Sequence, residues 1–328
     1  MVSRGLQWAW DPHGPPPLRR RRPYRRTSQS IIDRVGTLLT EGVIEPAGPW
    51  IFMNRLFEVP KRDSPTTRLV LDVSCLNLSI PTFKFRMTTV KTVRRTLRQG
   101  WYLASIDLKD AYWHVPIARS FRPYLAFSAG GDTYQFCVLP FGLNIAPRVF
   151  SKILQPVHSR LANLGVQIMM YLDDWLIMAP SSQQCEAMVR TTLRVGQEMG
   201  LLFNLAKSHL TPTTSLQWLG MTWDTTASTV ALSRDNQHRC ARALFRSLHS
   251  KSLSRRQWER LMGSLNHAAS IVPLGRLRTR RLLLEGAKFL SLTDRDTPVP
   301  FPKAVKPLLR WWSAKGLLRR PGPFLPHS

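Results

Sequence analysis

The sequence lacks the features that mark secreted and membrane proteins. Its four cysteines, Cys75, Cys137, Cys185 and Cys240, are widely spaced and include no C-x-x-C pair, so neither a disulfide framework nor a zinc site is expected. The start of the chain, MVSRGLQWAWDPHGPPP, has no apolar run of the signal-peptide kind. No stretch of about 18 apolar residues occurs anywhere. We therefore expect an intracellular protein with reduced thiols, in the cytoplasm or the nucleus, not secreted and without a membrane partner.

Acidic residues are scarce: 20 Asp and Glu are opposed by 47 Lys and Arg, a formal net charge of +27 at pH 7. Such an excess favours a polyanionic partner, because phosphates attract the protein and binding releases their counterions. With 328 residues, 43% of them hydrophobic, the chain can nevertheless form two or three compact units. Charge alone does not separate an enzyme from a protein that only binds, such as a ribosomal or chromatin protein.

Composition divides the chain into four segments. Residues 1–30 contain three consecutive prolines and the cluster LRRRRPYRR, so we expect a disordered basic segment, serving as a nuclear address, a nucleic-acid arm or a solvated tail. Strand-like and helical patterns alternate over residues 31–224. Three helices are expected in residues 225–295. Residues 296–328 are proline-rich and predict a linker toward a further domain.

The strongest chemical signal is the string MMYLDDWLIM, from Met169 to Met178. Two apolar runs flank an Asp-Asp pair, which predicts a β-hairpin with Asp173 and Asp174 at its tip. Carboxylates that converge on one point repel each other unless a cation lies between them, and hard divalent ions prefer oxygen ligands. A solvated Asp-Asp turn would show the same pattern, so the pair alone does not establish a metal site.

A third carboxylate, Asp107, directly follows a predicted strand, Tyr102–Ile106, in the string SIDLKDAY. Beside the hairpin tip it would complete a two-metal site, which clamps the attacking and leaving oxygens of a phosphoryl transfer. A helix N-cap is the alternative interpretation of this residue. Between the acids lies LPFGLNIAP, whose Gly142 permits close approach of backbone to a ligand, although the string also suits an ordinary turn.

Taken together, these strings resemble the reverse transcriptase family in order and spacing. SIDLKDAY is similar to the first palm motif, LPFGLNIAP to the motif that contacts template and nucleotide, and YLDD to the second catalytic motif. The other matching positions are VPK at 59–61, RLVLD at 68–72, Leu76-Asn77, Gly200-Leu201, Asn204, Lys207 and Trp218-Leu219-Gly220. The resemblance extends from about Ile31 to Asp224. Trp175, PLGRL at 273–277 and Arg310-Trp311-Trp312 most resemble the tyrosine-recombinase (DIRS-type) retrotransposons.

The resemblance implies a role for each matching residue. Asp107 and Asp173 would ligate two Mg²⁺ ions, or Mn²⁺, with Asp174 supporting the second, and Lys207 would donate a proton to the leaving pyrophosphate. Tyr112 would exclude a ribose 2′-hydroxyl. The residues implied to contact the nucleotide are Lys61, Arg68, Asp110, Ala111, Tyr112, Phe141 and Gly142. Phe141 stands where some viral members have glutamine. Trp218, Leu219 and Gly220 would form the primer grip.

The implied fold is an α+β right-hand polymerase. Its fingers precede and interleave with a palm, in which an antiparallel sheet with helices carries the YLDD hairpin, and a helical thumb follows. The basic region from Asp235 suits a thumb that grips a duplex, although a generic bundle with a solvated basic face has the same pattern. The implied partners are an RNA template, a DNA primer or RNA–DNA hybrid, and deoxynucleoside triphosphates. The oligomeric state stays open.

Three functions are compatible with these features. The first is template-directed DNA synthesis on RNA or DNA during retrotransposon replication. The second is a catalytically inactive nucleic-acid-binding remnant, although every metal-site carboxylate is present. The third is nuclease activity, since relatives often carry a ribonuclease H domain. Such a domain needs its own carboxylate cluster, and we expect none here. The acids after Asp224 are only Asp235, Glu259, Glu285, Asp294 and Asp296.

Overall fold

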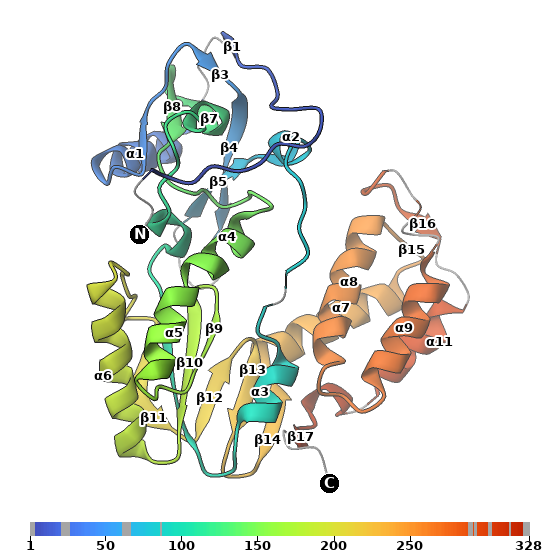
Figure 1. Cartoon of the computed structure of the whole chain (residues 1–328). Helices are drawn as coiled ribbons and strands as arrows, with labels where there is room; N and C mark the ends of the chain where they lie inside the picture. Colours follow the sequence, from blue (N-terminus) through green and yellow to red (C-terminus); the bar gives the residue numbers. More distant parts are fainter. Residues whose placement is uncertain are drawn as a thin grey trace.

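The computed structural model describes residues 4–20, 27–60, 67–85, 87–287, 291, 294–300, 304–314 and 316–323. These residues form three parts, which we call fingers, palm and thumb. In Figure 1 the fingers lie at the top, the palm lies below them and the thumb lies at the right. No helix within the described ranges has the length and apolar character that crossing a bilayer requires.

The fingers contain a five-stranded sheet in the order β2-β8-β7-β4-β5. Its strands are β2 (Ile44–Pro46), β4 (Met53–Pro60), β5 (Thr67–Asp72), β7 (Ala126–Ala129) and β8 (Asp132–Phe136). Neighbours are antiparallel except β4 and β7. The helices of this part are α1 (Gln29–Thr40) and α2 (Ser74–Asn77). Helix α1 begins where the Ser28 side chain accepts a hydrogen bond from the Ile31 N–H.

Residues 4–20 pack against the fingers, so the expectation of a disordered segment is wrong for them. Trp8 is only 8% exposed. Its ring lies edge-on to Phe121, and Trp10 stacks on the same Phe121 ring. Burial of large aromatic surface is a strong stabilising contribution, which outweighs the irregular composition of the segment.

Backbone pairing also attaches residues 4–20 to the fingers. Leu6 forms a parallel bridge with Ile117. Farther along, β1 (Arg19–Arg20) pairs with β3 (Trp50–Ile51). The remaining residues of the arginine cluster, 21–26, lie outside the described residues.

The palm is built on a four-stranded antiparallel sheet in the order β11-β6-β10-β9. Its strands are β6 (Tyr102–Asp107), β9 (Ile168–Tyr171), β10 (Asp174–Ala179) and β11 (His209–Thr213). The palm helices are α4 (Ala146–Ile153), α5 (Gln155–Asn163) and α6 (Ser182–Glu198), with the 3₁₀ turn η1 (Ala111–His114) after β6 and a second turn, η2 (Arg122–Leu125), before β7. Helices α5 and α6 lie against the sheet (Figure 1).

Strand β10 is buried on both faces, which explains its continuous apolar run. Because side chains alternate along a strand, Trp175 and Ile177 enter one hydrophobic core, which extends into the fingers. Leu176 and Met178 enter a second core, which extends into the thumb. The strand that begins with Asp174 is therefore held from both sides.

A second sheet in the order β12-β13-β14-β17 belongs to this second core. Its strands are β12 (Ser215–Trp218), β13 (Met221–Asp224), β14 (Thr229–Leu232) and β17 (Gly322–Pro323), and α3 (Val90–Thr96) contributes Val93 to the same core. Asp224 pairs with Thr229. The boundary expected after Asp224 therefore falls inside a hairpin, and the chain leaves the sheet only after Leu232.

The thumb contains the three helices expected in residues 225–295. They are α7 (Arg234–His249), α8 (Arg255–Ala268) and α9 (Gly275–Glu285); β15 (Ser252–Leu253), β16 (Val299–Pro300) and η3 (Leu317–Arg319) accompany them.

The expectation of a linker over residues 296–328 is wrong for most of its described part. Helix α11 (Val305–Trp312) packs beside α9, and Trp312 is fully buried in the second core. Its apolar residues, Val305, Leu308, Leu309 and Trp312, recur at helical spacing, a signal that the proline content masks. Beyond α11, β17 closes the second sheet through its pairing with β14.

Candidate active site

The YLDD string forms the predicted hairpin. Strands β9 and β10 are joined by Leu172 and Asp173, and Tyr171 pairs with Asp174. Leu172 has a φ of +55°, a left-handed conformation that is unfavourable for a leucine. The Trp175 indole N–H donates a hydrogen bond to the Leu172 carbonyl at 2.9 Å, and Trp175 is itself fully buried. The core thus holds the turn that presents Asp173.

Sheet pairing brings Asp107 to this hairpin. Asp107 ends β6 and lies opposite Asp174 of β10. The next N–H, of Leu108, donates to the Asp173 carbonyl at 2.8 Å. Asp107 is a strand residue and not a helix N-cap, so the alternative interpretation of its role is wrong. Asp107 is far from Asp173 and Asp174 in the sequence, and adjacent acids on a regular strand would point to opposite faces. In the fold, all three carboxylates are neighbours at one edge of the sheet.

The segment after α6 completes the surroundings of Asp107. The Asp107 N–H donates to the Ser208 hydroxyl at 3.0 Å, and its carbonyl accepts from the Asn204 N–H at 2.8 Å. Burial, followed by the charges of Asp173 and Asp110, raises the pKa of Asp107, whereas Lys207 and the Asn204 side chain act in the opposite direction. Sequence reasoning did not single out Ser208, because serine after a basic motif carries no distinctive pattern.

Asp174 is the most deeply buried of the three acids. Burial, with smaller contributions from Asp173 and Asp107, raises its pKa to about 7. The Trp218 indole N–H faces this carboxylate and offsets part of the rise, although its geometry falls short of a full hydrogen bond. Mutual repulsion between buried carboxylates is relieved by a cation, and oxygen-only donors suit Mg²⁺.

The carboxylates fit Mg²⁺ as part of a shared ligand set. No group of three or more Asp, Glu, His or Cys side chains in the described ranges is arranged to hold an ion by itself. Mg²⁺ is usually bound by one or two carboxylates together with waters and substrate phosphates. Asp107 and Asp173 both face a cavity of about 400 Å³, in which such a substrate can contribute the missing oxygens.

Three of the predicted nucleotide-contacting residues and three of the predicted catalytic residues line that cavity. The first group is Asp110, Ala111 and Phe141, and the second is Asp107, Asp173 and Lys207; Lys109, Asn204 and Arg34 join them. Asp110 has a φ of +46° where the chain turns into η1. Tyr112 lies behind the lining, 8% exposed, with its ring 4.9 Å from that of Phe141 and 5.7 Å from that of Phe150.

Three predicted positions need separate description. Gly142 has a φ of +111°, and a Cβ there would lie 3.0 Å from the Leu71 carbonyl oxygen, so tight backbone packing accounts for this glycine. Lys61 lies outside the described residues. Arg68 is placed by its backbone only, opposite Val59 in the fingers sheet.

The three residues expected to form a primer grip lie at the tip of the β12–β13 hairpin. Leu219 and Gly220 line a second cavity of about 910 Å³ between palm and thumb, which Tyr171 also reaches. Trp218 is only 2% exposed and does not line this cavity. Of the three expected primer-grip residues, two therefore face open space and one supports Asp174.

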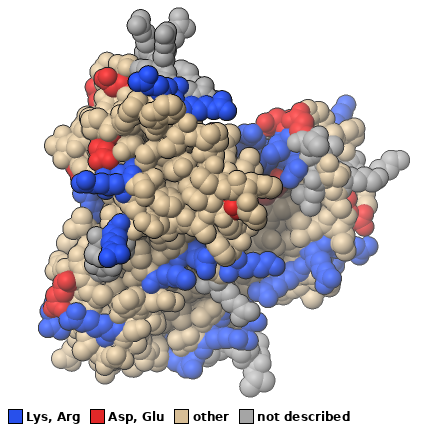
Figure 2. Space-filling model, turned by 45° about the horizontal axis from the view of Figure 1, so that its top comes forward, with Lys and Arg blue, Asp and Glu red and all other residues tan. Residues whose placement is uncertain are grey.

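Arginines line the thumb side of the 910 Å³ cavity. Arg239, Arg242 and Arg246 lie one helical turn apart on α7, and Arg260 faces them from α8. Figure 2 shows a band of Lys and Arg across the middle of this face and onto the thumb, with few acids near it. Sequence reasoning noted the basic region but not these residues, although their spacing of three and four is visible in α7.

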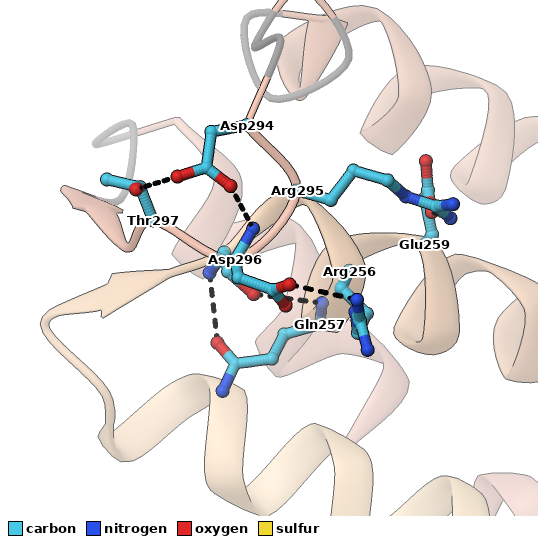
Figure 3. A network of polar contacts seen from close by, with 8 residues as sticks. Arg256, Gln257, Glu259, Asp294, Arg295, Asp296 and Thr297 are labelled. Carbon is cyan, nitrogen blue, oxygen red and sulfur yellow. Dashed lines mark hydrogen bonds and ion pairs between the residues drawn. The ribbon is translucent and has the colours of Figure 1, made fainter. Parts of the chain in front are cut away.

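The acids of the thumb tip are engaged with arginines (Figure 3). Glu259 contacts both Arg255 and Arg295, which lowers its pKa. Arg256 pairs with Asp296 at 2.8 Å. The neighbouring Asp294 accepts hydrogen bonds from Thr297 and from the Asp296 N–H. These contacts fasten the segment before β16 onto the start of α8, where Ser254 and Gln257 form a capping box.

Comparison with known proteins identifies the family. The family model described as reverse transcriptase (RNA-dependent DNA polymerase) matches residues 59–223. Protein P of heron hepatitis B virus is 28% identical over 172 residues, which is 51% of this chain and 22% of that protein. The retrovirus-related Pol polyprotein from transposon gypsy of Drosophila melanogaster is 26% identical over 195 residues, 56% of this chain and 19% of the polyprotein. The chain thus spans about a fifth of the length of these relatives.

Solved structures show the same fold. The foamy viral protease-reverse transcriptase, in complex with double-stranded DNA, has a TM-score of 0.71 at 19% identity and covers 98% of this chain and 52% of its own. The same viral protein in complex with an RNA/DNA hybrid has a TM-score of 0.70 at 19% identity, over 94% of this chain and 39% of its own. The expected α+β polymerase fold is confirmed. With half of its residues in the family model and its motif acids gathered at one sheet edge, the chain belongs to the reverse transcriptase family.

Proposed function

We propose that the chain synthesises DNA on an RNA or DNA template by two-metal nucleotidyl transfer, with Mg²⁺ as the natural ion and Mn²⁺ as a substitute. The observation that carries the proposal is the pairing of Asp107 with Asp174 across β6 and β10, which puts both beside Asp173, with Asp107 and Asp173 lining a cavity of about 400 Å³. When bound, the ions would polarise the phosphate and stabilise the attacking and leaving oxygens.

The side chains around the cavity would bind and orient the nucleotide. Asp107 and Asp173 would hold the ions, with Asp174 contributing from its buried position. Lys207 shares the cavity with Asp107 and would donate a proton to the pyrophosphate leaving group. Asp110 and the Ala111 backbone N–H would border the triphosphate, with Lys61 and Arg68 as the cations that hold it.

The larger cavity would receive the primer–template duplex. Its lining combines Leu219 and Gly220 with four arginines, Arg239, Arg242, Arg246 and Arg260, a composition that suits sugar–phosphate backbones. The two foamy viral structures, in complex with double-stranded DNA and with an RNA/DNA hybrid, support a duplex of either kind as the partner.

The biological setting that we propose is retrotransposon replication, in an element of the DIRS type. The gypsy polyprotein supports a retroelement origin. For the finer assignment, the supporting features are Trp175, the PLGRL string and the Arg310-Trp311-Trp312 string. The last two belong to the thumb, in which α9 begins within PLGRL and Trp312 is buried against Gly275.

Primer extension tests the proposal. The purified chain with Mg²⁺, a primed RNA template and deoxynucleotides should extend the primer. Asp107→Asn or Asp173→Asn should lower the rate by at least about 100-fold, because several kcal/mol of metal-based stabilisation is lost. Duplex affinity should change less than twofold. Asp33→Asn, the same change on the exposed side of α1, should leave the rate unaltered. Tight duplex binding without any extension would instead favour the inactive remnant.

A further inference from the structure

The turn between β12 and β13 has a conformation that its sequence does not favour. Leu219 and Gly220 both have positive φ values, +50° and +69°. This two-residue turn is usually occupied by asparagine or glycine, and a leucine in a left-handed conformation persists only where its surroundings impose it. The turn is therefore held in place by contacts outside its own hairpin.

Those contacts come from the thumb. The Gly220 carbonyl accepts one hydrogen bond from the Ser233 N–H at 3.0 Å and another from the Asn236 side-chain amide at 2.8 Å. The same amide nitrogen lies 3.3 Å from Nε2 of His267, near the end of α8. One asparagine on α7 thus joins the turn to both thumb helices that line the 910 Å³ cavity.

The thumb side chains pack tightly around Gly220. A Cβ at this position would lie 2.1 Å from the Asn236 amide nitrogen and 3.1 Å from His267 Nε2. Only glycine is compatible with this approach. The contact is independent evidence, beside the strained Leu219, that thumb and turn are matched to one another.

The β12–β13 hairpin connects the turn that the thumb holds to the residues around Asp174. Trp218, directly before the turn, is 2% exposed and faces the Asp174 carboxylate. On the other side, Leu219 and Gly220 share the cavity wall with Tyr171, which precedes the catalytic turn. A displacement of Gly220 would therefore move both the surface offered to the primer and the indole beside Asp174.

We propose that Asn236 is a positioning residue for the primer end. Through its amide, α7 and α8 hold the Leu219–Gly220 turn at the place where a primer terminus must lie for attack on the nucleotide. The proposal rests on the proposed function, since it assigns the turn to the primer. It differs from duplex gripping, because Asn236 sets the position of the bound strand's end and not the strength of binding.

Asn236→Ala tests this role, with Gln237→Ala as the matched control. Gln237 is the next residue of α7, and its amide donates to the Leu232 carbonyl instead. In Asn236→Ala, the turnover number for extension should fall about tenfold or more, because small misplacements of reacting groups are costly. Duplex affinity and the KM for the nucleotide should stay within twofold. Gln237→Ala should leave all three values within twofold of the unmodified protein.

Asn236→Gln is a second variant, which is expected to preserve the stability of the folded protein. Glutamine three residues after Ser233 can form a capping box, as Gln257 does with Ser254, so α7 keeps a stable start. Its amide oxygen would then accept from the Ser233 N–H, so the Gly220 carbonyl would lose both of its thumb donors. This variant should lose turnover like Asn236→Ala while its melting temperature is preserved.

A double-mutant cycle measures the contact itself, without catalysis. Gly220→Ala should shift the unfolding midpoint less in an Asn236→Ala background than in the unmodified protein, because the 2.1 Å clash is gone. Additive effects of the two changes on the unfolding midpoint would overturn the proposed contact.

Two results would overturn the positioning role. In the first, Asn236→Ala and Gln237→Ala behave alike. In the second, Asn236→Ala lowers turnover, duplex affinity and melting temperature together. Failure of the unmodified protein to extend any primer would count against the proposed function, while the cycle would still test the contact.

Discussion

The three carboxylates differ in their exposure to the 400 Å³ cavity. Asp107 and Asp173 line it, whereas Asp174 is turned toward Trp218 and the palm interior. Burial makes ionisation of Asp174 costly in the metal-free protein, and its acidic neighbours add to that cost. The ionised form of Asp174 is therefore unfavourable without a bound cation, which favours binding of the metal ion together with substrate.

This arrangement predicts a pH dependence of stability in the presence of a chelator. The pKa of Asp174 is raised to about 7, so between pH 5 and 7 the folded protein retains a proton that the unfolded chain has released. The free energy of unfolding should therefore fall as pH rises through this window, by on the order of a few kcal/mol, and level off above it. Urea denaturation at several pH values measures this.

Asp174→Asn isolates the contribution of this residue. The pKa of His267 is lowered, chiefly by burial, so its titration acts in the opposite direction and is common to both proteins. Asp107, whose pKa is raised, leaves a smaller slope of the same sign in the variant. Identical pH profiles for the variant and the unmodified protein would show that Asp174 is ionised across the window.

The proposed role of Tyr112 is to discriminate between sugars. Its ring is packed against Phe141, which lines the nucleotide cavity, and burial raises the pKa of its hydroxyl to about 12, so it stays uncharged. Tyr112→Ala should increase ribonucleotide relative to deoxynucleotide incorporation by roughly tenfold or more, because space opens beside C2′. Single-nucleotide extension with each substrate measures the ratio. Tyr112→Phe keeps the ring and should keep the ratio; an equal loss of both activities in Tyr112→Ala would indicate packing alone.

Among the elements, β10 determines how rigidly the site is held. Strand β10 carries Asp174 at its start and has both faces in hydrophobic cores. Trp175 links the core to the hairpin tip, because its ring is buried in the core and its indole N–H donates a hydrogen bond to the Leu172 carbonyl. The tip is thus fixed by burial and not by a favourable turn sequence.

The N-terminal segment is predicted to stabilise the fingers. Trp8→Ala should lower the free energy of unfolding by about 3 kcal/mol, because a buried indole is removed from its contacts with Trp10 and Phe121. Guanidinium denaturation measures the change. Trp50→Ala is the control, since Trp50 is 59% exposed and its loss should cost well under half as much. Equal effects of the two changes would mean that residues 4–20 add nothing to fingers stability.

At the scale of the whole molecule, part of the net charge of +27 is concentrated in the arginines of the 910 Å³ cavity and in the band of Lys and Arg seen in Figure 2. Duplex affinity should fall roughly a hundredfold between 50 and 200 mM salt if the four cavity arginines each contact a phosphate. Filter binding or fluorescence anisotropy measures the slope. Arg242→Ala should reduce the slope by about one phosphate contact, whereas Arg190→Ala, on α6 and paired with Glu186, should not change it. A slope that Arg242→Ala leaves intact would place the duplex elsewhere.

The sequence by itself determined the chemistry of this protein. A local pattern was sufficient for the YLDD hairpin, because apolar runs and an intervening acidic pair specify strand, turn and strand within ten residues. The order of the motifs identified the family, the fold and the acids at positions 107, 173 and 174. Helices α7 and α8 followed from their helical pattern, with an apolar stripe in α8, and a third helix was expected from Gly275.

Only the tertiary structure decided which residues share a surface. The packing of Trp8 on Phe121, the burial of Trp312 and the pairing of β17 with β14 all join segments far apart in the chain, and irregular or proline-rich composition hid them. The approach of Asn236 to Gly220 is of the same kind. Local propensity acts over a few residues, whereas these contacts depend on long-range burial. Composition alone therefore assigned residues 1–30 to a disordered segment and residues 296–328 to a linker, whereas the fold makes residues 4–20 part of the fingers and α11 part of the thumb.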